Sequence, residues 1–150
     1  MSVPPIGCCP HARLQNLVTV SGCLTELNDY ALAFHSMISA LLQSLSSQLR
    51  GMIYSLGDTY TMTSIVLKEP LAFGIENIEE ACCGSGLLDA EKPCYIADRP
   101  NLCPNRSKYL FWDLYHPTQY AAHLAAITLF TGDPSLVAPM NFSQLVQASA

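Results

Sequence analysis

The sequence predicts a layered α/β fold, and two observations lead to this expectation. Apolar residues recur at helical spacing across residues 24–49, and a short apolar run bounded by glycines follows directly. Helix-like and strand-like segments alternate further along the chain, as in layered α/β folds. Only one segment is a convincing strand, whereas a parallel sheet needs several. The pattern therefore predicts the later part of a larger domain.

The first predicted helix spans Leu24 to Leu49, and Gly51 ends it. Its apolar residues form one stripe, which we expect to be buried against the core. The stripe consists of Leu27, Tyr30, Ala31, Phe34, Ile38, Leu41, Leu42, Leu45 and Leu49. The apolar run from Met52 to Leu56 is predicted to be a buried strand.

A second helix is predicted from Thr59 to about Glu69. Asp58 is expected to cap it, because aspartate accepts hydrogen bonds from the free N–H groups of a first turn. Pro70 and Gly74 then end the helix. Residues 74–108 show no sustained period, so we expect a long irregular loop.

The last part of the chain predicts two more helices. Tyr109 to Trp112 is expected to be extended, and Pro117 is expected at the first helical position, where a missing N–H costs nothing. That helix runs to about Thr131 and stops at Gly132. Asn141 is expected to cap a short final helix.

Seven cysteines are many for a chain of this length and indicate disulfides. Their spacing lacks the paired CxxC or HxxxH pattern of a zinc site, and no metal or cofactor is expected. Cys23 is expected to pair with Cys8 or Cys9, and four further cysteines permit three pairings. These four are Cys82, Cys83, Cys94 and Cys103. Two glycosylation sequons, at Asn105 and Asn141, also suit a secreted protein, although no signal peptide precedes them.

Composition restricts the partners of the chain. At 150 residues it has the size of one domain, and its formal net charge of −5 with a pI near 5.1 disfavours nucleic acid. No window of about 18 apolar residues predicts a membrane span. Half of the residues are hydrophobic and only 13% are charged. This low charge density indicates a surface that meets a partner.

Asp113 and His116 are the residues most suggestive of reaction chemistry. An imidazole is a useful general base near neutral pH when a carboxylate fixes its tautomer and orientation. The short spacing lets the two side chains meet without long-range folding. The alternative is that Asp113 only caps the helix that follows.

The surrounding segments resemble the plant GDSL esterase/lipases, a branch of the SGNH hydrolases. The resemblance covers essentially the whole chain and is carried by five segments in family order. They are Pro4-Pro5-Ile6-Gly7-Cys8, Gly22-Cys23 leading into Glu26-Leu27-Asn28, Ala81-Cys82-Cys83-Gly84, Leu102-Cys103-Pro104-Asn105-Arg106 and Phe111-Trp112-Asp113-Leu114-Tyr115-His116-Pro117-Thr118.

The resemblance implies that residues 1–150 form a single partial domain, the C-terminal portion of a three-layer α/β/α (flavodoxin-like) hydrolase with an incomplete sheet. It implies hydrolysis of acyl or lipid esters in an extracellular setting, with Asp113 and His116 as two members of a Ser-Asp-His triad. Cys9 stands where the family usually has an apolar residue, so it is the expected free thiol.

The chain also departs from the family pattern. The blocks expected to supply the serine and the oxyanion hole are not found, and the missing signal peptide has the same explanation. Gly57-Asp58-Thr59 mimics the serine block, but Asp58 is expected to act there as a cap. We therefore expect no ester turnover by this chain alone. The alternative is a catalytically inactive fragment that associates through an exposed sheet edge.

Overall fold

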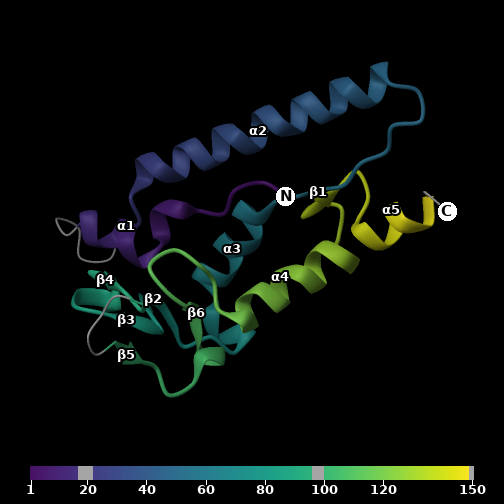
Figure 1. Cartoon of the computed structure of the whole chain (residues 1–150). Coiled ribbons are helices and arrows are strands. Elements are labelled where there is room, and N and C mark those ends of the chain that lie inside the picture. The colour runs from purple at the N-terminus through teal and green to yellow at the C-terminus, as the bar shows by residue number, and fades with distance from the viewer. Residues whose placement is uncertain (17–21, 96–99, 149–150) are drawn as a thin grey trace.

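The fold is described from a computed structural model that covers residues 1–16, 22–95 and 100–148 (Figure 1). Its helices are α1 (Pro10–Gln15), α2 (Thr25–Gln48), α3 (Thr59–Lys68), α4 (Gln119–Thr131) and α5 (Phe142–Ala148). Its strands are β1 (Leu56–Gly57), β2 (Asn77–Ala81), β3 (Cys83–Ser85), β4 (Lys92–Pro93), β5 (Asn101–Leu102), β6 (Tyr109–Phe111) and β7 (Val137–Ala138). The mixture of helix and sheet confirms the predicted α/β class.

The strands of the described residues form three small sheets. β2 and β6 pair in parallel, β1 and β7 pair antiparallel, and β3 lies between β4 and β5 in an antiparallel sheet. The prediction of a buried strand from Met52 to Leu56 is wrong, because β1 begins only at Leu56, where Ala138 of β7 provides a pairing partner. The prediction of an irregular loop over residues 74–108 is also wrong in part, since four short strands lie there.

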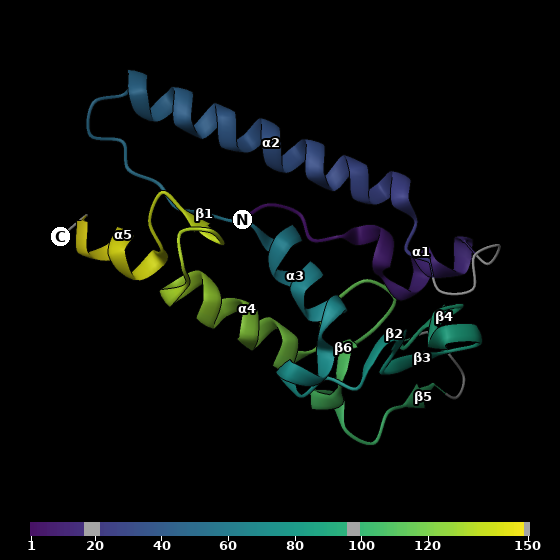
Figure 2. The ribbon, with the colours of Figure 1, turned by 180° about the vertical axis from the view of Figure 1, so that it is seen from behind.

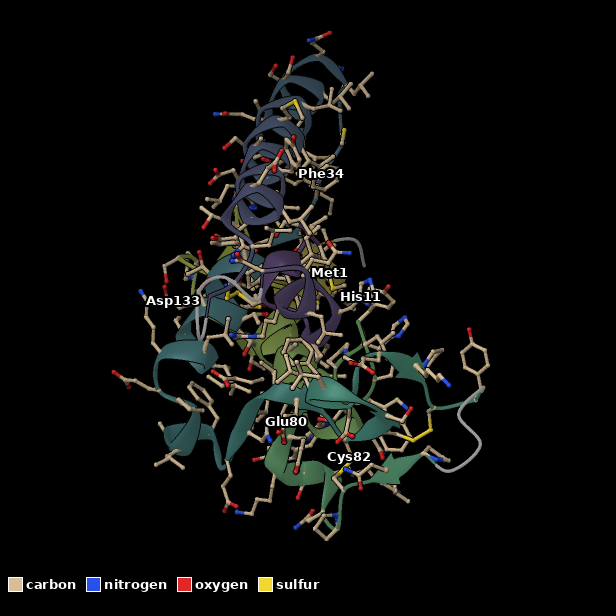
Figure 3. The ribbon with its side chains drawn as sticks, turned by 90° about the vertical axis from the view of Figure 1, so that its left-hand side faces the viewer. Met1, His11, Phe34, Glu80, Cys82 and Asp133 are labelled. Atoms are coloured by element: carbon tan, nitrogen blue, oxygen red, sulfur yellow. A yellow bond between two sulfur atoms is a disulfide. The ribbon has the colours of Figure 1, made fainter. Side chains whose placement is uncertain are left out.

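Helix α2 confirms the predicted helix but contradicts its predicted burial. Of the expected stripe only Ala31 is buried, while Phe34 is 41% exposed and Leu41 52% exposed. Figures 1 and 2 show α2 running at a distance from α4, and Figure 3 labels Phe34 on the part of α2 that extends away from the rest of the chain. Apolar spacing specifies a helix with one apolar face, but burial depends on what that face meets.

The beginning of α2 is attached to the short turn η1 (Ile6–Cys8). The Gly7 N–H donates to Asn28 Oδ1 at 2.8 Å, and the Leu24 N–H donates to the Gly7 carbonyl at 2.7 Å. A Cβ at position 7 would lie 2.0 Å from the Leu24 carbonyl oxygen, so glycine is required for this close approach. The Cys8–Cys23 disulfide adds a covalent link and settles which cysteine pairs with Cys23.

The predicted helix ends are largely confirmed. Asp58 caps α3 by accepting from the Thr61 N–H at 3.1 Å. Asn141 precedes α5 and accepts from the Gln144 N–H at 3.0 Å, and the Gln144 side chain accepts in return from the Asn141 N–H. Pro117 is not the first residue of α4. Thr118 is its cap, so the proline lies one residue outside the helix.

The core behind β6 gathers residues from distant parts of the sequence. Its buried members are Cys9, Ile75, Leu110, Phe111 and Ala121. Cys9 is a buried free thiol, as predicted. The cysteine-rich segment is closed by disulfides Cys82–Cys103 and Cys83–Cys94, which selects one of the three possible pairings.

Ile75 provides a test of this core. Ile75→Ala should lower the free energy of unfolding by about 2–5 kcal/mol, because the fully buried side chain leaves a cavity. Ile65→Ala on α3 removes the same atoms from a side chain that is 38% exposed, and should change stability by about 0.5 kcal/mol or less. Urea unfolding monitored by circular dichroism gives both values. Equal losses in the two variants would contradict the assignment of Ile75 to the core.

Candidate active site

The candidate site lies on the loop that connects β6 to α4. The Trp112 N–H donates to the His116 carbonyl at 2.8 Å, and the Thr118 N–H donates to the Leu110 carbonyl at 2.9 Å. Phe111 and Pro117 form an isolated bridge between these two bonds. The backbone on both sides of residues 113–115 is therefore held in a fixed frame.

Asp113 organises the inside of this loop. Its Oδ1 accepts from the Tyr115 N–H at 2.9 Å and from the His116 N–H at 2.8 Å. This is the local bonding by which aspartate stabilises a turn of its own backbone. Asp113 does not cap α4, since Thr118 accepts from the Ala121 N–H there. The alternative that the aspartate is only a helix cap is therefore wrong.

The two side chains meet as the sequence predicts. His116 Nδ1 lies 2.9 Å from both Asp113 Oδ1 and Asp113 Oδ2. An ionised carboxylate can only accept hydrogen bonds, so Nδ1 must carry the proton. In a neutral imidazole the lone pair then lies on Nε2. The His116 side chain is 74% exposed and the Asp113 side chain 25%, so the basic nitrogen belongs to the accessible member of the pair.

The pKa of Asp113 is lowered from its ordinary value. Partial burial alone would raise it, but the N–H groups of Tyr115 and His116 and the imidazole of His116 all favour the charged carboxylate and outweigh that effect. The same bonds that shape the turn thus keep Asp113 ionised, which is the state that can hold a protonated Nδ1.

Within the described ranges no serine or threonine hydroxyl is hydrogen-bonded to the His116 ring. The mimic of the serine block, Gly57-Asp58-Thr59, is used for structure. The Thr59 hydroxyl is buried and donates to the Ser2 carbonyl at 2.7 Å, and Asp58 caps α3. The prediction that Asp58 is a cap is confirmed. The arrangement of Asp113 and His116 can accept and return a proton, but the described residues add no attacking group to it.

Three further histidines lie within the described residues. His123 is exposed on α4, and His35 is partly buried, with Nδ1 3.8 Å from Asp58 Oδ1. His11 packs its ring against Tyr115 inside the Asp-His loop, at a centroid distance of 5.1 Å. No sequence signal linked position 11 to position 115, because they lie on separate elements. No group of three or more metal-binding side chains is found in the part of the chain that is described.

The fold and this loop place the chain among proteins of the α/β class that carry an Asp-x-x-His block. Comparison with known proteins gives the particular family. Residues 1–129 match GDSL-like lipase/acylhydrolase, and the chain belongs to that family. Among curated proteins of Arabidopsis thaliana, it is 34% identical to GDSL esterase/lipase At1g71250 over 143 residues. It is 35% identical to GDSL esterase/lipase At2g04570 over 127 residues.

These matches cover much of this chain but a minor share of each relative. The first covers 95% of this chain and 38% of At1g71250, and the second covers 85% and 36%. The chain thus spans about two fifths of the length of the curated relatives it matches. No helix in the described ranges is long and apolar enough to cross a membrane.

The lowered pKa of Asp113 gives a pH prediction. Its interactions stabilise the fold above the ordinary carboxyl pKa of about 3.9, and this stability is lost as the pH falls through the lowered pKa. Urea unfolding should therefore show wild type more stable than Asp113→Asn at about pH 6, with the difference shrinking toward about pH 2. Asp29→Asn, on exposed α2, is the control. A difference independent of pH would contradict the role of the charge.

Proposed function

We propose that this chain provides the acid and the base of a Ser-Asp-His ester hydrolase. His116 is the general base and then the general acid, and Asp113 orients it and stabilises the imidazolium. The observation that supports this most strongly is the position of His116 Nδ1, 2.9 Å from both carboxylate oxygens. That geometry sets the tautomer that a serine hydrolase requires.

The reaction would proceed in two halves. His116 Nε2 takes the proton of a serine hydroxyl as its oxygen attacks the acyl carbonyl, and then gives that proton to the departing alcohol. In the second half Nε2 takes a proton from water, whose oxygen attacks the acyl-serine, and returns it to the serine. No described serine bonds to His116, so the attacking hydroxyl is expected from polypeptide outside the described residues.

The substrate class is a carboxylic ester of small-molecule size, in line with the family. Three disulfides support an oxidising compartment, and we propose an extracellular location on that basis. The competing proposal is a non-catalytic chain that binds another polypeptide. It is favoured by the apolar residues left exposed on α2, such as Met37, which is 66% exposed.

A chimera tests the proposed catalytic role. In it, this chain replaces the 143-residue matched segment of the Arabidopsis relative At1g71250. If the parent chimera hydrolyses a short-chain p-nitrophenyl ester, His116→Gln should lower kcat by about 10⁴-fold or more, and Asp113→Asn by about 10⁴-fold. His123→Gln changes an exposed histidine of α4 and should leave kcat unaltered.

Measurements on the isolated chain complete the design. It should not hydrolyse the ester above the buffer rate, because a base without its nucleophile contributes little. A chimera that keeps its activity after His116→Gln would exclude the proposed base. Hydrolysis by the isolated chain that disappears with His116→Gln would show that the nucleophile lies within these 150 residues.

A further inference from the structure

The backbone of the Asp-His loop is held by a second element, the beginning of α1. The carbonyls of Leu114 and Tyr115 both face this element. The Leu114 carbonyl accepts from the His11 N–H at 3.2 Å, and the Tyr115 carbonyl accepts from the Cys9 thiol at 3.6 Å. Two successive peptide groups inside the turn are thus bound from one side.

Both donors suit this contact. His11 lies in the first turn of α1, where N–H groups have no partner within the helix and are free to bind elsewhere. Burial is the main cause that raises the pKa of the Cys9 thiol to about 11; Arg13 opposes it, and the nearby charge of Asp113 acts in the same direction as burial. Cys9 therefore keeps its proton near neutral pH and can donate it to the Tyr115 carbonyl.

The side chains add a third contact at the same place. The His11 and Tyr115 rings lie 5.1 Å apart and are tilted by 58°, a favourable arrangement for aromatic groups. The His11 position is labelled in Figure 3. His11 Nε2 is also 3.2 Å from Gln15 Nε2, one helical turn later, which limits rotation of the imidazole. Tyr115 is therefore bound through both its carbonyl and its ring.

The beginning of α1 is itself firmly anchored. The buried Arg13 donates through Nε to the Cys8 carbonyl at 2.9 Å and lies 3.8 Å from Glu79 of β2. Cys8 is joined to Cys23 by a disulfide. A rigid support is what a positioning role requires, because a mobile neighbour could not fix the loop.

We propose that Cys9, His11 and Tyr115 are positioning residues that hold the Asp113–His116 pair in its bonded geometry. Tyr115 is the link, because its N–H donates to Asp113 Oδ1 while its carbonyl accepts from Cys9. Fixing this residue fixes the direction of two N–H groups toward the carboxylate, and the carboxylate then selects the Nδ1–H tautomer. This proposal rests on the proposed function only in assigning acid-base chemistry to Asp113 and His116. The positioning of the two side chains is a separate claim.

Nitrogen NMR of the isolated, oxidised chain tests this without any catalytic assay. The ring ¹⁵N shifts of His116 report which nitrogen carries the proton, and hydrogen exchange reports the Tyr115 and His116 amides. Cys9→Ala should lower the Nδ1–H fraction and speed exchange of both amides by about fivefold, as the loss of one ordinary hydrogen bond implies. Tyr115→Ala keeps both backbone groups and removes only the ring contact with His11, so it should shift both readouts in the same direction by a smaller factor. His123 provides an internal reference in each spectrum.

Conservative variants separate positioning from general stability. Cys9→Ser retains a donor and Tyr115→Phe retains the ring, so both should restore the wild-type tautomer and exchange rates. His11→Ala keeps the backbone donor but removes the same ring contact as Tyr115→Ala, so these two variants should have matching effects, both smaller than that of Cys9→Ala. Melting temperatures measured alongside identify any variant that is merely unfolded.

The outcomes are distinct from those of the ester assay. Alanine variants that fold and keep the wild-type His116 tautomer and exchange rates would overturn the positioning proposal, whatever the chimera does. A changed tautomer that the conservative variants restore would support it, even if the chimera shows no hydrolysis. If an alanine variant does not fold, the comparison rests on Cys9→Ser and Tyr115→Phe against Tyr115→Leu.

Discussion

The carboxylate of Asp113 is the constraint on which the rest of the site depends. It accepts from two backbone N–H groups and from the imidazole of His116, all within four residues. The backbone bonds make the turn, and the turn brings the imidazole to the carboxylate. Turn geometry and acid-base geometry are therefore the same set of interactions, and all of them are made within residues 113–116.

The strand-to-helix connection supplies the frame around this turn. Thr118 is fully buried, and its hydroxyl donates to the Tyr109 carbonyl at 2.8 Å while accepting from the Ala121 N–H. One side chain thus joins the beginning of β6 to the first turn of α4. On the other side, the Cys82 and Cys83 N–H groups donate to the carbonyls of Phe111 and Trp112. Because both cysteines are in disulfides, the segment that supplies these donors is covalently closed.

What the sequence could predict follows the range of each interaction. The caps at Asp58 and Asn141 and the meeting of Asp113 with His116 are local, and all were predicted from spacing. The predicted strand over residues 52–56 was wrong, because β1 begins where it pairs with β7. The partner strand lies some 80 residues away in the sequence, so local spacing could not reveal it. The contact of His11 with Tyr115 joins two elements that no periodicity relates, so it was missed.

The exposed face of α2 shows the same distinction between forming an element and covering it. From Tyr30 to Gln48 the helix carries no Asp, Glu, Lys or Arg, a composition unsuited to a face that meets only water. In the described residues its hydrogen bonds to η1 run through Gly7 and Asn28, and His35 Nδ1 lies 3.8 Å from Asp58 Oδ1 at the start of α3. The next residues after η1, Cys9 and His11, are those that hold the Asp-His loop.

One short stretch, residues 7–11, therefore touches both the origin of α2 and the loop of the proposed acid and base. Asn28 Nδ2 donates to Cys8 Sγ at 3.4 Å, so even the disulfide at the start of this stretch is in contact with α2. A partner that covered the apolar face of α2 would bind a helix whose first turn is hydrogen-bonded to residues 7 and 8. The described hydrogen bonds therefore connect the first turn of α2 to the Asp-His loop through residues 7–11.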